Sequence, residues 1–414
     1  MNYKGLALLA LMICMMWLTD RPGAATAADY KLQPSLSLSQ EYNDNIFLSR
    51  TDRRDDFITG ITPGLRFTLN DPVFLADVAA AYTQRIYAKN TKQSDNPFSL
   101  NAITRLQVLK DTLYLEISDV YQRVSLDTSR DYTQESSFVN QTDSNTFTVH
   151  PYFILRPSSL LTLTAGYKFI DIWYKDAASI PKRDHVGYLQ AQYEAMSNLL
   201  FNGNYTITRG EAPTFDFWRH EVSFGPKYMY AKDSSISVAI GNTWVDYGNG
   251  RSNSNIFLSG GLTHSFGTLV VMLTAQQKFQ DNPDSTPSRV NAYALNIQKT
   301  FPRTLLTGGI YLNKNYRTEV NRLDTQTYGA RAGLKYELTP LMTAGCDVGL
   351  ERIERKLGLE SNTKRFLVSL PLTYALTQKV SMTANYRFTN LSTPETTTDN
   401  YHNNRFVVSA TANF

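Results

Sequence analysis

The sequence predicts an all-β protein, a single transmembrane antiparallel up-and-down β-barrel of about 20 strands (roughly 18 to 22). Three observations support this fold class. Segments with alternating apolar and polar residues recur along the whole chain, and the connections between them alternate between short and long. Beyond the first residues, no apolar run approaches the roughly 20 residues that a transmembrane helix needs. The chain has 414 residues, of which 42% are hydrophobic and 19% charged.

The alternation is clear in the segment 328–338, YGARAGLKYEL. Its tyrosine, alanine and leucine residues fall on one face, and its glycine and charged residues fall on the other. A period of two is typical of a strand with one apolar and one polar face. The segments 57–69, 380–388 and 406–414 follow the same rule. A barrel in lipid would turn the apolar face outward, whereas a soluble sandwich or propeller, the alternative, would turn it inward.

The lengths of the connections predict that the two ends of the barrel differ. Those at 70–72, 109–112, 156–159, 196–198, 301–303, 339–340 and 377–378 are short. Those at 48–56, 88–97, 125–143, 175–182, 280–287, 355–362 and 392–402 are longer and polar. This pattern is typical of short periplasmic turns and long extracellular loops. Pro226 and Pro371 fall inside predicted strands, which indicates either a bulge or a misplaced boundary.

Aromatic residues gather near the ends of predicted strands and favour girdles at the two membrane interfaces. They are Trp173, Tyr174, Phe217, Trp218, Tyr228, Tyr230, Trp244, Tyr386 and Phe388.

The N-terminus resembles a secretory signal peptide. Lys4 precedes the apolar run 5–18, and Ala25 and Ala27 form a small-x-small cleavage site. We therefore expect residues 1–27 to be removed and residues 28–414 to form the barrel in the outer membrane of a Gram-negative bacterium, with outer-membrane lipid as its surroundings. The last strand ends in Phe414 and resembles the signal by which the outer-membrane assembly machinery recognises its substrates.

The stretch 37–67, SLSQEYNDNIFLSRTDRRDDFITGITPGLRF, is the most distinctive part of the chain. It resembles the opening of the β-barrel porin type 2 family. That resemblance implies an outer-membrane barrel associated with exopolysaccharide production and export, and so a polysaccharide partner. Beyond this first hairpin the resemblance is only architectural. The matching residues are Tyr42, Asn43, Asp44, Asn45, Ile46, Phe47, Asp56, Pro63 and Gly64.

The same stretch is rich in oxygen ligands that Ca²⁺ could use, because Asp52, Asp55 and Asp56 follow Asn43, Asp44 and Asn45. Their irregular spacing favours a structural hairpin instead, since Asn and Asp satisfy their own backbone in turns. We predict neither a metal site nor a cofactor.

Basic residues on the predicted polar faces outnumber the acidic ones, Glu116, Glu221, Glu337, Asp347 and Glu351. A basic lumen lining would favour anions such as an acidic polysaccharide. The alternative is that these charges pair across strands. The net charge of +4 gives no case for a nucleic-acid partner. The predicted lining residues are Arg66, Arg85, Arg105, Lys168, Arg219, Lys227, Arg331, Lys335, Arg387 and Arg405.

The sequence holds no catalytic motif, and we predict that the protein is not an enzyme. His185 and His220 each adjoin an acidic residue, but neighbours in a strand point to opposite faces. His402 lies near Asp399 in a predicted loop. The leading function is a passive pore linked to exopolysaccharide passage. The alternatives are a non-conducting barrel that binds polysaccharide at the cell surface and a lipid- or peptide-modifying enzyme.

Overall fold

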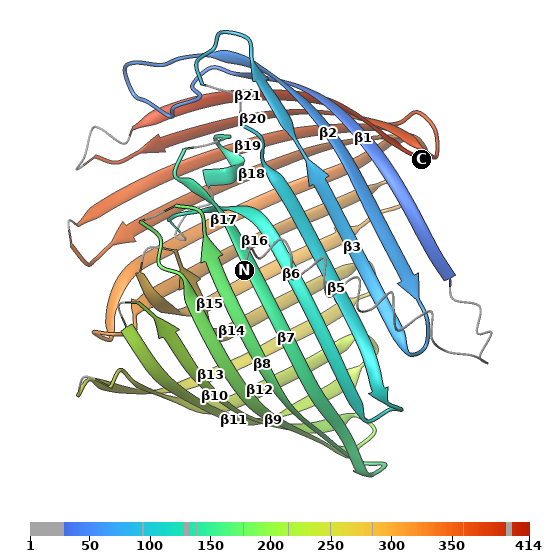
Figure 1. Ribbon diagram of the computed structural model, residues 1–414, viewed down its shortest axis with the longest axis vertical. Helices are drawn as coiled ribbons and strands as arrows, with labels where there is room; N and C mark the ends of the chain where they lie inside the picture. Colours follow the sequence, from blue (N-terminus) through green and yellow to red (C-terminus); the bar gives the residue numbers. More distant parts are fainter. Residues whose placement is uncertain are drawn as a thin grey trace.

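The computed structural model describes residues 29–92, 95–127, 132–137, 139–176, 178–213, 215–248, 250–283, 285–358, 360–394 and 400–414. The predicted signal peptide and its cleavage site lie outside the described residues. One antiparallel sheet contains every strand of the described chain (Figure 1).

The first half of the sheet consists of β1 (Asp29–Asn43), β2 (Asp56–Asn70), β3 (Phe74–Tyr82), β4 (Gln84–Tyr87), β5 (Phe98–Leu109), β6 (Leu113–Ser125), β7 (Gln141–Ser158), β8 (Leu161–Tyr174), β9 (Lys182–Met196) and β10 (Leu199–Ala212). The second half consists of β11 (Phe215–Ala231), β12 (Ser234–Asp246), β13 (Ser252–Phe266), β14 (Leu269–Asn282), β15 (Ser285–Thr300), β16 (Thr304–Arg317), β17 (Arg322–Thr339), β18 (Met342–Arg355), β19 (Ser361–Ala375), β20 (Val380–Ser392) and β21 (Tyr401–Asn413).

The sheet closes into a barrel because β1 pairs with both β2 and β21. Each strand is antiparallel to its neighbours, so the predicted up-and-down barrel is confirmed. Between the predicted connections at 70–72 and 88–97 one strand would fit, but the structure divides these residues at Thr83, whose N–H bonds to the Pro97 carbonyl at 2.9 Å. Both β3 and β4 pair with β2, so the 21 strands occupy 20 positions in the wall.

The apolar face of the strands points away from the enclosed space. Ile256 and Leu258, for example, are 74% and 68% exposed on this outer face. A soluble protein seldom exposes so continuous an apolar surface, whereas lipid covers it in an outer-membrane barrel. No helix of the described chain is long and apolar enough to cross a membrane.

Most of the predicted girdle residues lie on this outer face. Trp173, Trp218 and Trp244 are partly exposed near the ends of β8, β11 and β12 that carry the long loops. Two of the predicted residues do not belong to a girdle, because Tyr174 and Phe217 point inward and are buried. Adjacent residues alternate between faces, so only one of each aromatic pair can meet lipid.

The two mid-strand prolines cause neither a bulge nor a boundary. The β11–β12 register is the same on both sides of Pro226, and the β18–β19 register is the same on both sides of Pro371. Only the cross-strand pairs next to each proline are missing. Proline lacks an N–H group, so the ladder is interrupted locally without a shift of register.

Candidate functional site: the barrel interior and its extracellular end

The strand register places all the predicted basic lining residues on the inward face, opposite the apolar one. Many of them have an acidic partner there. Arg66 bonds to Asp77 at 2.6 Å, and Arg405 bonds to Glu41 at 2.8 Å. Arg331 lies 3.6 Å from Glu351. The remaining close pairs are Arg85 with Asp95 and Arg219 with Glu221.

Sequence reasoning missed three of these acids, Glu41, Asp77 and Asp95. Glu41 directly precedes residues 42–47, the part of the first hairpin that resembles the porin type 2 family and that we call the porin-like motif. Asp77 lies in an alanine-rich strand with little contrast between its faces, and Asp95 lies in a loop. Cross-strand pairing with the arginines would have identified Glu41 and Asp77. Using it requires the strand register, which alternation alone does not give. The predicted basic excess of the lumen is therefore smaller in the structure than in the sequence.

Two of the predicted lysines have no ion-pair partner within 4 Å among the described residues. Lys227 and Lys335 lie on the inward face near the short-turn ends of β11 and β17. Neither forms an ion pair with the residues that the structure describes. They can attract anions that reach this part of the lumen.

Four aromatic side chains cover the inner wall of β6, β7 and β9, and we call them the lumen aromatic patch: Tyr114, His150, Tyr152 and Tyr188. The Tyr114 and Tyr152 rings are stacked, with centroids 5.2 Å apart and planes 15° apart. The His150 ring stacks on Tyr152 at 4.7 Å. The Tyr188 hydroxyl lies 2.8 Å from His150 Nε2. The patch is thus a continuous aromatic surface fixed by ring contacts and a hydrogen bond.

Charged groups surround the lumen aromatic patch. Lys168 Nζ lies 5.6 Å from the centre of the Tyr188 ring, and Glu116 lies 3.8 Å from His150. Arg105 is the direct cross-strand neighbour of Glu116. Flat ring faces flanked by charged donors and acceptors suit a ligand with apolar ring faces and many polar groups.

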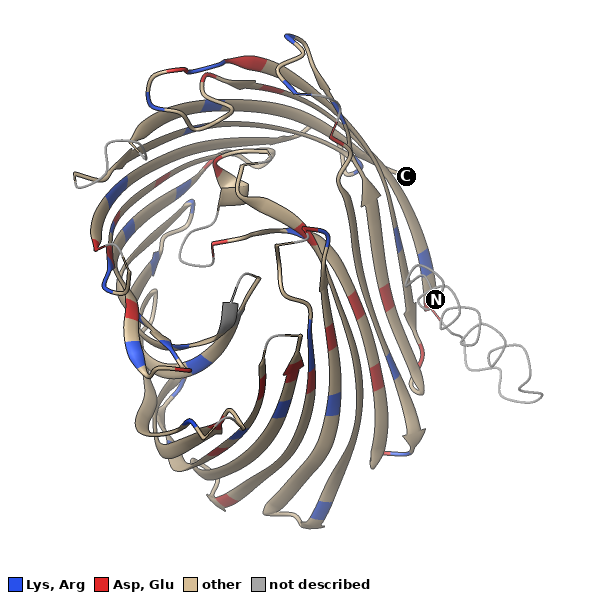
Figure 2. Cartoon of the chain, turned by 60° about the vertical axis from the view of Figure 1, so that its left-hand side comes forward, with Lys and Arg blue, Asp and Glu red and all other residues tan. Residues whose placement is uncertain are grey.

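A short segment, residues 132–137, folds into the long-loop end of the barrel, and we call it the inward segment (Figure 2). It includes the 3₁₀ turn η1 (Tyr132–Gln134). Glu135 is completely buried and bonds to Arg365 at 2.5 Å and to the Tyr401 hydroxyl. Since Arg365 and Tyr401 belong to β19 and β21, the carboxylate connects the β6–β7 connection to distant strands.

Backbone and hydroxyl groups of the inward segment make further contacts. The Gln134 carbonyl accepts hydrogen bonds from Arg387 at 2.7 Å and from Arg405 at 3.1 Å. Ser136 Oγ donates to the Ile46 carbonyl at 3.1 Å. Two of the predicted lining residues therefore hold a segment of the chain in the lumen instead of facing open solvent.

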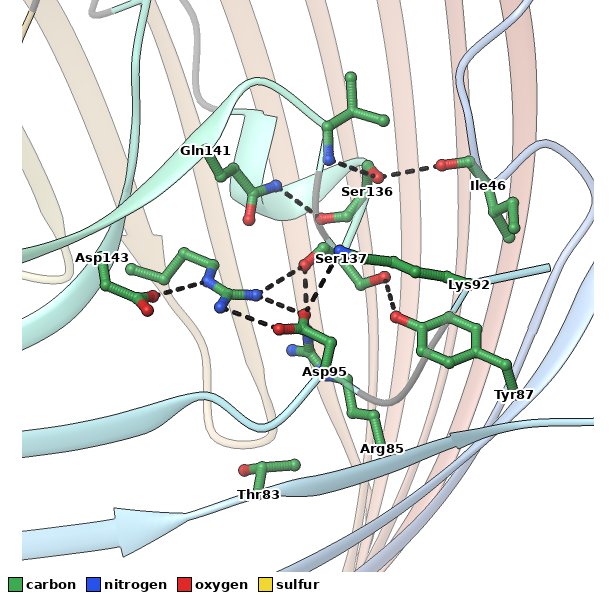
Figure 3. Close-up of polar contacts among 12 residues, drawn as sticks. Ile46, Thr83, Arg85, Tyr87, Lys92, Asp95, Ser136, Ser137, Gln141 and Asp143 are labelled. Atoms are coloured by element: carbon green, nitrogen blue, oxygen red, sulfur yellow. Dashed lines mark hydrogen bonds and ion pairs between the residues drawn. The ribbon is translucent and has the colours of Figure 1, made fainter. Parts of the chain in front are cut away.

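Asp95, in the β4–β5 connection, is linked to the inward segment through two arginines (Figure 3). Its carboxylate bonds to Arg123 at 2.5 Å and to Arg85 at 3.2 Å. Both arginines also donate to the Ser137 carbonyl. Burial alone would raise the pKa of Asp95, but the Arg123 hydrogen bond and the nearby positive charges outweigh it and lower this pKa.

The connection at 280–287, predicted as a long loop, is instead the tip of the β14–β15 hairpin. The Pro283 carbonyl accepts a hydrogen bond at 2.7 Å from Ile180, in the β8–β9 connection. The Asn282 carbonyl accepts another from Lys182 Nζ. Strands β9 to β13 separate these two parts of the wall. The hairpin tip therefore leaves its own place in the wall and lies inside the long-loop end.

The porin-like motif ties the two ends of the barrel sheet together. Asn45 is fully buried; its side chain donates to the Ser49 and His402 carbonyls at 2.7 and 3.0 Å and accepts from the Ser49 N–H at 2.8 Å. Asn403 donates to Asn43 Oδ1 at 2.7 Å and to the Asn45 carbonyl at 3.0 Å. The motif therefore stabilises the seam where β1 meets β21.

The acidic groups near the motif are already engaged. Asp44 accepts two hydrogen bonds from Asn404, and Asp56 accepts one from the Lys89 N–H at 2.9 Å. Asp55 bonds to Lys89 Nζ at 2.6 Å, and Asp52 lies 3.2 Å from Arg54. In the described chain, no group of three or more His, Cys, Asp or Glu side chains is placed to hold a metal ion.

Three of the histidines have tyrosine or arginine partners. His185 and His220 lie on the outer face, where each bonds to a tyrosine hydroxyl, at 2.6 and 2.8 Å. His402 belongs to β21 and faces Arg53. Asp399, the acid noted beside it, lies outside the described residues.

Comparison with known proteins shows the fold. The sequence matches no protein-family model, and no curated protein matches it. The structure is similar to the ferric-catecholate import receptor Fiu of E. coli K12, with a TM-score of 0.53 and 10% identity over 93% of this chain and 82% of that one. It is similar to the FrpB iron transporter of Neisseria meningitidis, with a TM-score of 0.53 and 8% identity over 92% and 82%. The Pseudomonas aeruginosa channel OccK1 (OpdK) matches with a TM-score of 0.46 and 10% identity over 93% and 99%.

The likeness to Fiu and FrpB shows that this chain shares their β-barrel fold. The chain is a closed β-barrel protein of the Gram-negative outer membrane.

Proposed function

We propose that this barrel is a passive conduit for saccharides, and that its passenger is an acidic exopolysaccharide or a fragment of one. The lumen aromatic patch is the observation that carries the proposal. Sugar rings have apolar faces that can lie on aromatic rings, and their hydroxyl groups can bond to the charged groups beside the patch. The resemblance of the first hairpin to the β-barrel porin type 2 family supports the same assignment.

The charge distribution favours an acidic passenger. Lys168 borders the lumen aromatic patch, and Lys227 and Lys335 form no ion pair with the described residues. Nothing in this arrangement uses chemical energy, so the direction of transport would follow the concentration gradient.

The test is conductance of the purified, folded barrel in a planar bilayer, with acidic and neutral oligosaccharides added to look for block. We expect an anion-selective channel that acidic fragments block more strongly than neutral ones. Tyr152→Ala should weaken the block about fivefold, because one ring contact is worth about 1 kcal/mol. Tyr374→Ala, on the outer face, is the matched control.

A second candidate function is a non-conducting barrel that binds polysaccharide at the cell surface. The buried Glu135 contacts favour it, because they hold the inward segment inside the long-loop end. A folded barrel that shows no conductance, yet binds acidic polysaccharide, would favour this candidate and contradict the conduit.

A further inference from the structure

The wall of the barrel is not continuous between β13 and β14. Their ladder covers only Gly260–Phe266 of β13 and Leu269–Ala275 of β14. Towards the long-loop end, β13 continues to pair with β12, and β14 continues to pair with β15. The facing edges, 252–259 and 276–282, are therefore not joined by a ladder. Unpaired backbone edges are costly in lipid, so an opening here demands an explanation.

Beyond the opening, β14 passes to the inner side of the wall. The Gln277 side chain donates to Thr243 Oγ1 at 3.0 Å and accepts from Asn255 Nδ2 at 2.7 Å. Thr243 and Asn255 are cross-strand neighbours on the inward face of β12 and β13. The upper part of β14 thus lies over that inward face, which agrees with the inward position of the β14–β15 tip.

A groove of about 530 Å³ follows the opening between the two layers. Ile256 and Leu258 line it on the lipid side, together with Leu273 and Tyr293. Asn291 lines it further in, and the Asn291 Oδ1 atom is buried without a hydrogen-bond partner. The groove is therefore apolar where it meets the membrane and polar at its inner end.

Arg289 lies two residues beyond Asn291 on the same face of β15. Its side chain is only 7% exposed, and its Nε atom has no hydrogen-bond partner. The Tyr316 ring lies 4.5 Å from the guanidinium carbon, but Arg289 forms no ion pair within the described chain. A buried guanidinium is costly unless an anion compensates it.

Other buried or half-buried arginines of the interior show what Arg289 lacks. Arg365 bonds to two carboxylates, Arg405 bonds to one, and Arg219 bonds to Glu221 at 2.8 Å. Each of these sites supplies its own anion. At Arg289 the anion must come from elsewhere, and the neighbouring groove leads to the lipid.

We propose that the opening between β13 and β14 is a lateral binding site for a single-chain anionic amphiphile, such as a fatty-acid carboxylate, taken from the membrane. The anionic head pairs with Arg289, two residues beyond the inner end of the groove. The chain lies in the groove beside Ile256 and Leu258 and leaves through the opening. This site is separate from the lumen aromatic patch and does not depend on saccharide transport.

The test is equilibrium binding of radiolabelled dodecanoate to the full barrel in lipid nanodiscs, with binding to empty nanodiscs subtracted. We expect dodecanoate to bind at least about tenfold more tightly than dodecanol, because only the carboxylate can pair with Arg289. Affinity should also increase with chain length from octanoate to dodecanoate, because each added methylene is buried in the groove.

Arg289→Gln should abolish the preference for dodecanoate over dodecanol, whereas Arg183→Gln, a matched change of an exposed arginine on β9, should preserve it. Should Arg289→Gln fail to fold, the comparison of dodecanoate with dodecanol on the unaltered protein remains decisive. The double variant Ile256→Ala, Leu258→Ala should keep the preference for the anion but reduce the dependence on chain length. Equal binding of dodecanoate and dodecanol, or unchanged binding by a folded Arg289→Gln barrel, would overturn the proposal.

Discussion

Single buried polar side chains hold the long-loop end of this barrel in place. Asn45 illustrates the point, because all its hydrogen bonds go to backbone groups or motif partners at the seam of β1 and β21. Asn45→Ala removes three hydrogen bonds and leaves their buried partners unsatisfied. Since each unsatisfied group costs about 1–3 kcal/mol, we expect a loss of several kcal/mol in the free energy of unfolding.

Urea unfolding of the refolded barrel measures this loss. Asn101→Ala is the matched control, because Asn101 is exposed on the inward face of β5 and its loss should change stability by less than about 0.5 kcal/mol. Equal midpoints for the two variants would contradict a structural role for the motif and would reopen a ligand-binding role.

Asp95 makes the inward segment sensitive to acid. Its pKa is lower in the folded chain than the ordinary 3.8, because its bond to Arg123 and the surrounding positive charges overcome the effect of burial. A carboxyl group of this kind stabilises the fold above its unfolded pKa, and the contribution is lost as pH falls through the folded pKa. The contact should therefore be intact at neutral pH and be released only below about pH 4.

Limited proteolysis of the β6–β7 connection at a series of pH values, with an acid-active protease, measures that release. Asp95→Asn cannot titrate and should show the released pattern at every pH. A release in the parent protein that begins near pH 6 would point to a histidine instead of Asp95.

At the scale of elements, the inward segment is the clearest candidate for a gate or plug. Glu135→Gln keeps the shape of the side chain but removes the charge that pairs with the buried Arg365. Breaking a buried ion pair typically costs about 3–5 kcal/mol, because a buried charge loses its partner. We therefore expect the segment to leave the lumen and the single-channel conductance to increase.

The control for this change is Glu319→Gln, because Glu319 forms an exposed pair with Arg251 and should leave conductance unaltered. If Glu135→Gln conducts like the parent protein although hydrogen exchange shows that the segment is released, the segment does not obstruct the pore.

The sequence predicted the wall elements well and the interior poorly. Alternation of period two fixes which residues share a face, and so the outward position of Ala330 and the inward position of Arg331 follow from it. The inward segment has no such periodicity, and its place depends on contacts with strands more than 200 residues away in the chain, such as Glu135 with Tyr401. Local patterns carry no information about contacts of that range.

The β14–β15 hairpin shows a second limit. Its residues alternate as the other strands do, so the sequence gives no sign that the strands leave the wall. The polar character of 280–287 indicated a loop, but the cause is that the hairpin tip meets the polar β8–β9 connection inside the barrel. The described residues of the tip, Asn282 and Pro283, are buried at this contact.

For the molecule as a whole, closure of the barrel depends on the last strand. Nine residues of β21, Arg405–Asn413, pair with β1, and the Phe414 N–H bonds to the Pro34 carbonyl at 2.9 Å. The Phe414 side chain itself is 65% exposed on the finished barrel. Its contribution to folded stability should therefore be small, about the 1 kcal/mol of one backbone hydrogen bond.

The terminal aromatic residue could serve the stability of the folded barrel or its recognition by the assembly machinery, and deleting Phe414 distinguishes these two explanations. If Phe414 serves mainly as a signal to the assembly machinery, its deletion should reduce the amount of folded barrel in cells several-fold while leaving the urea midpoint of refolded protein nearly unchanged. Deletion of Tyr30, an equally exposed aromatic residue at the start of β1, would shift the whole register, so Tyr30→Ala is the appropriate control. Heat-modifiable mobility on gels measures the folded fraction in each case. A normal yield without Phe414 would show that the assembly machinery recognises β21 without its final residue, and that the rest of β21 suffices to close the sheet.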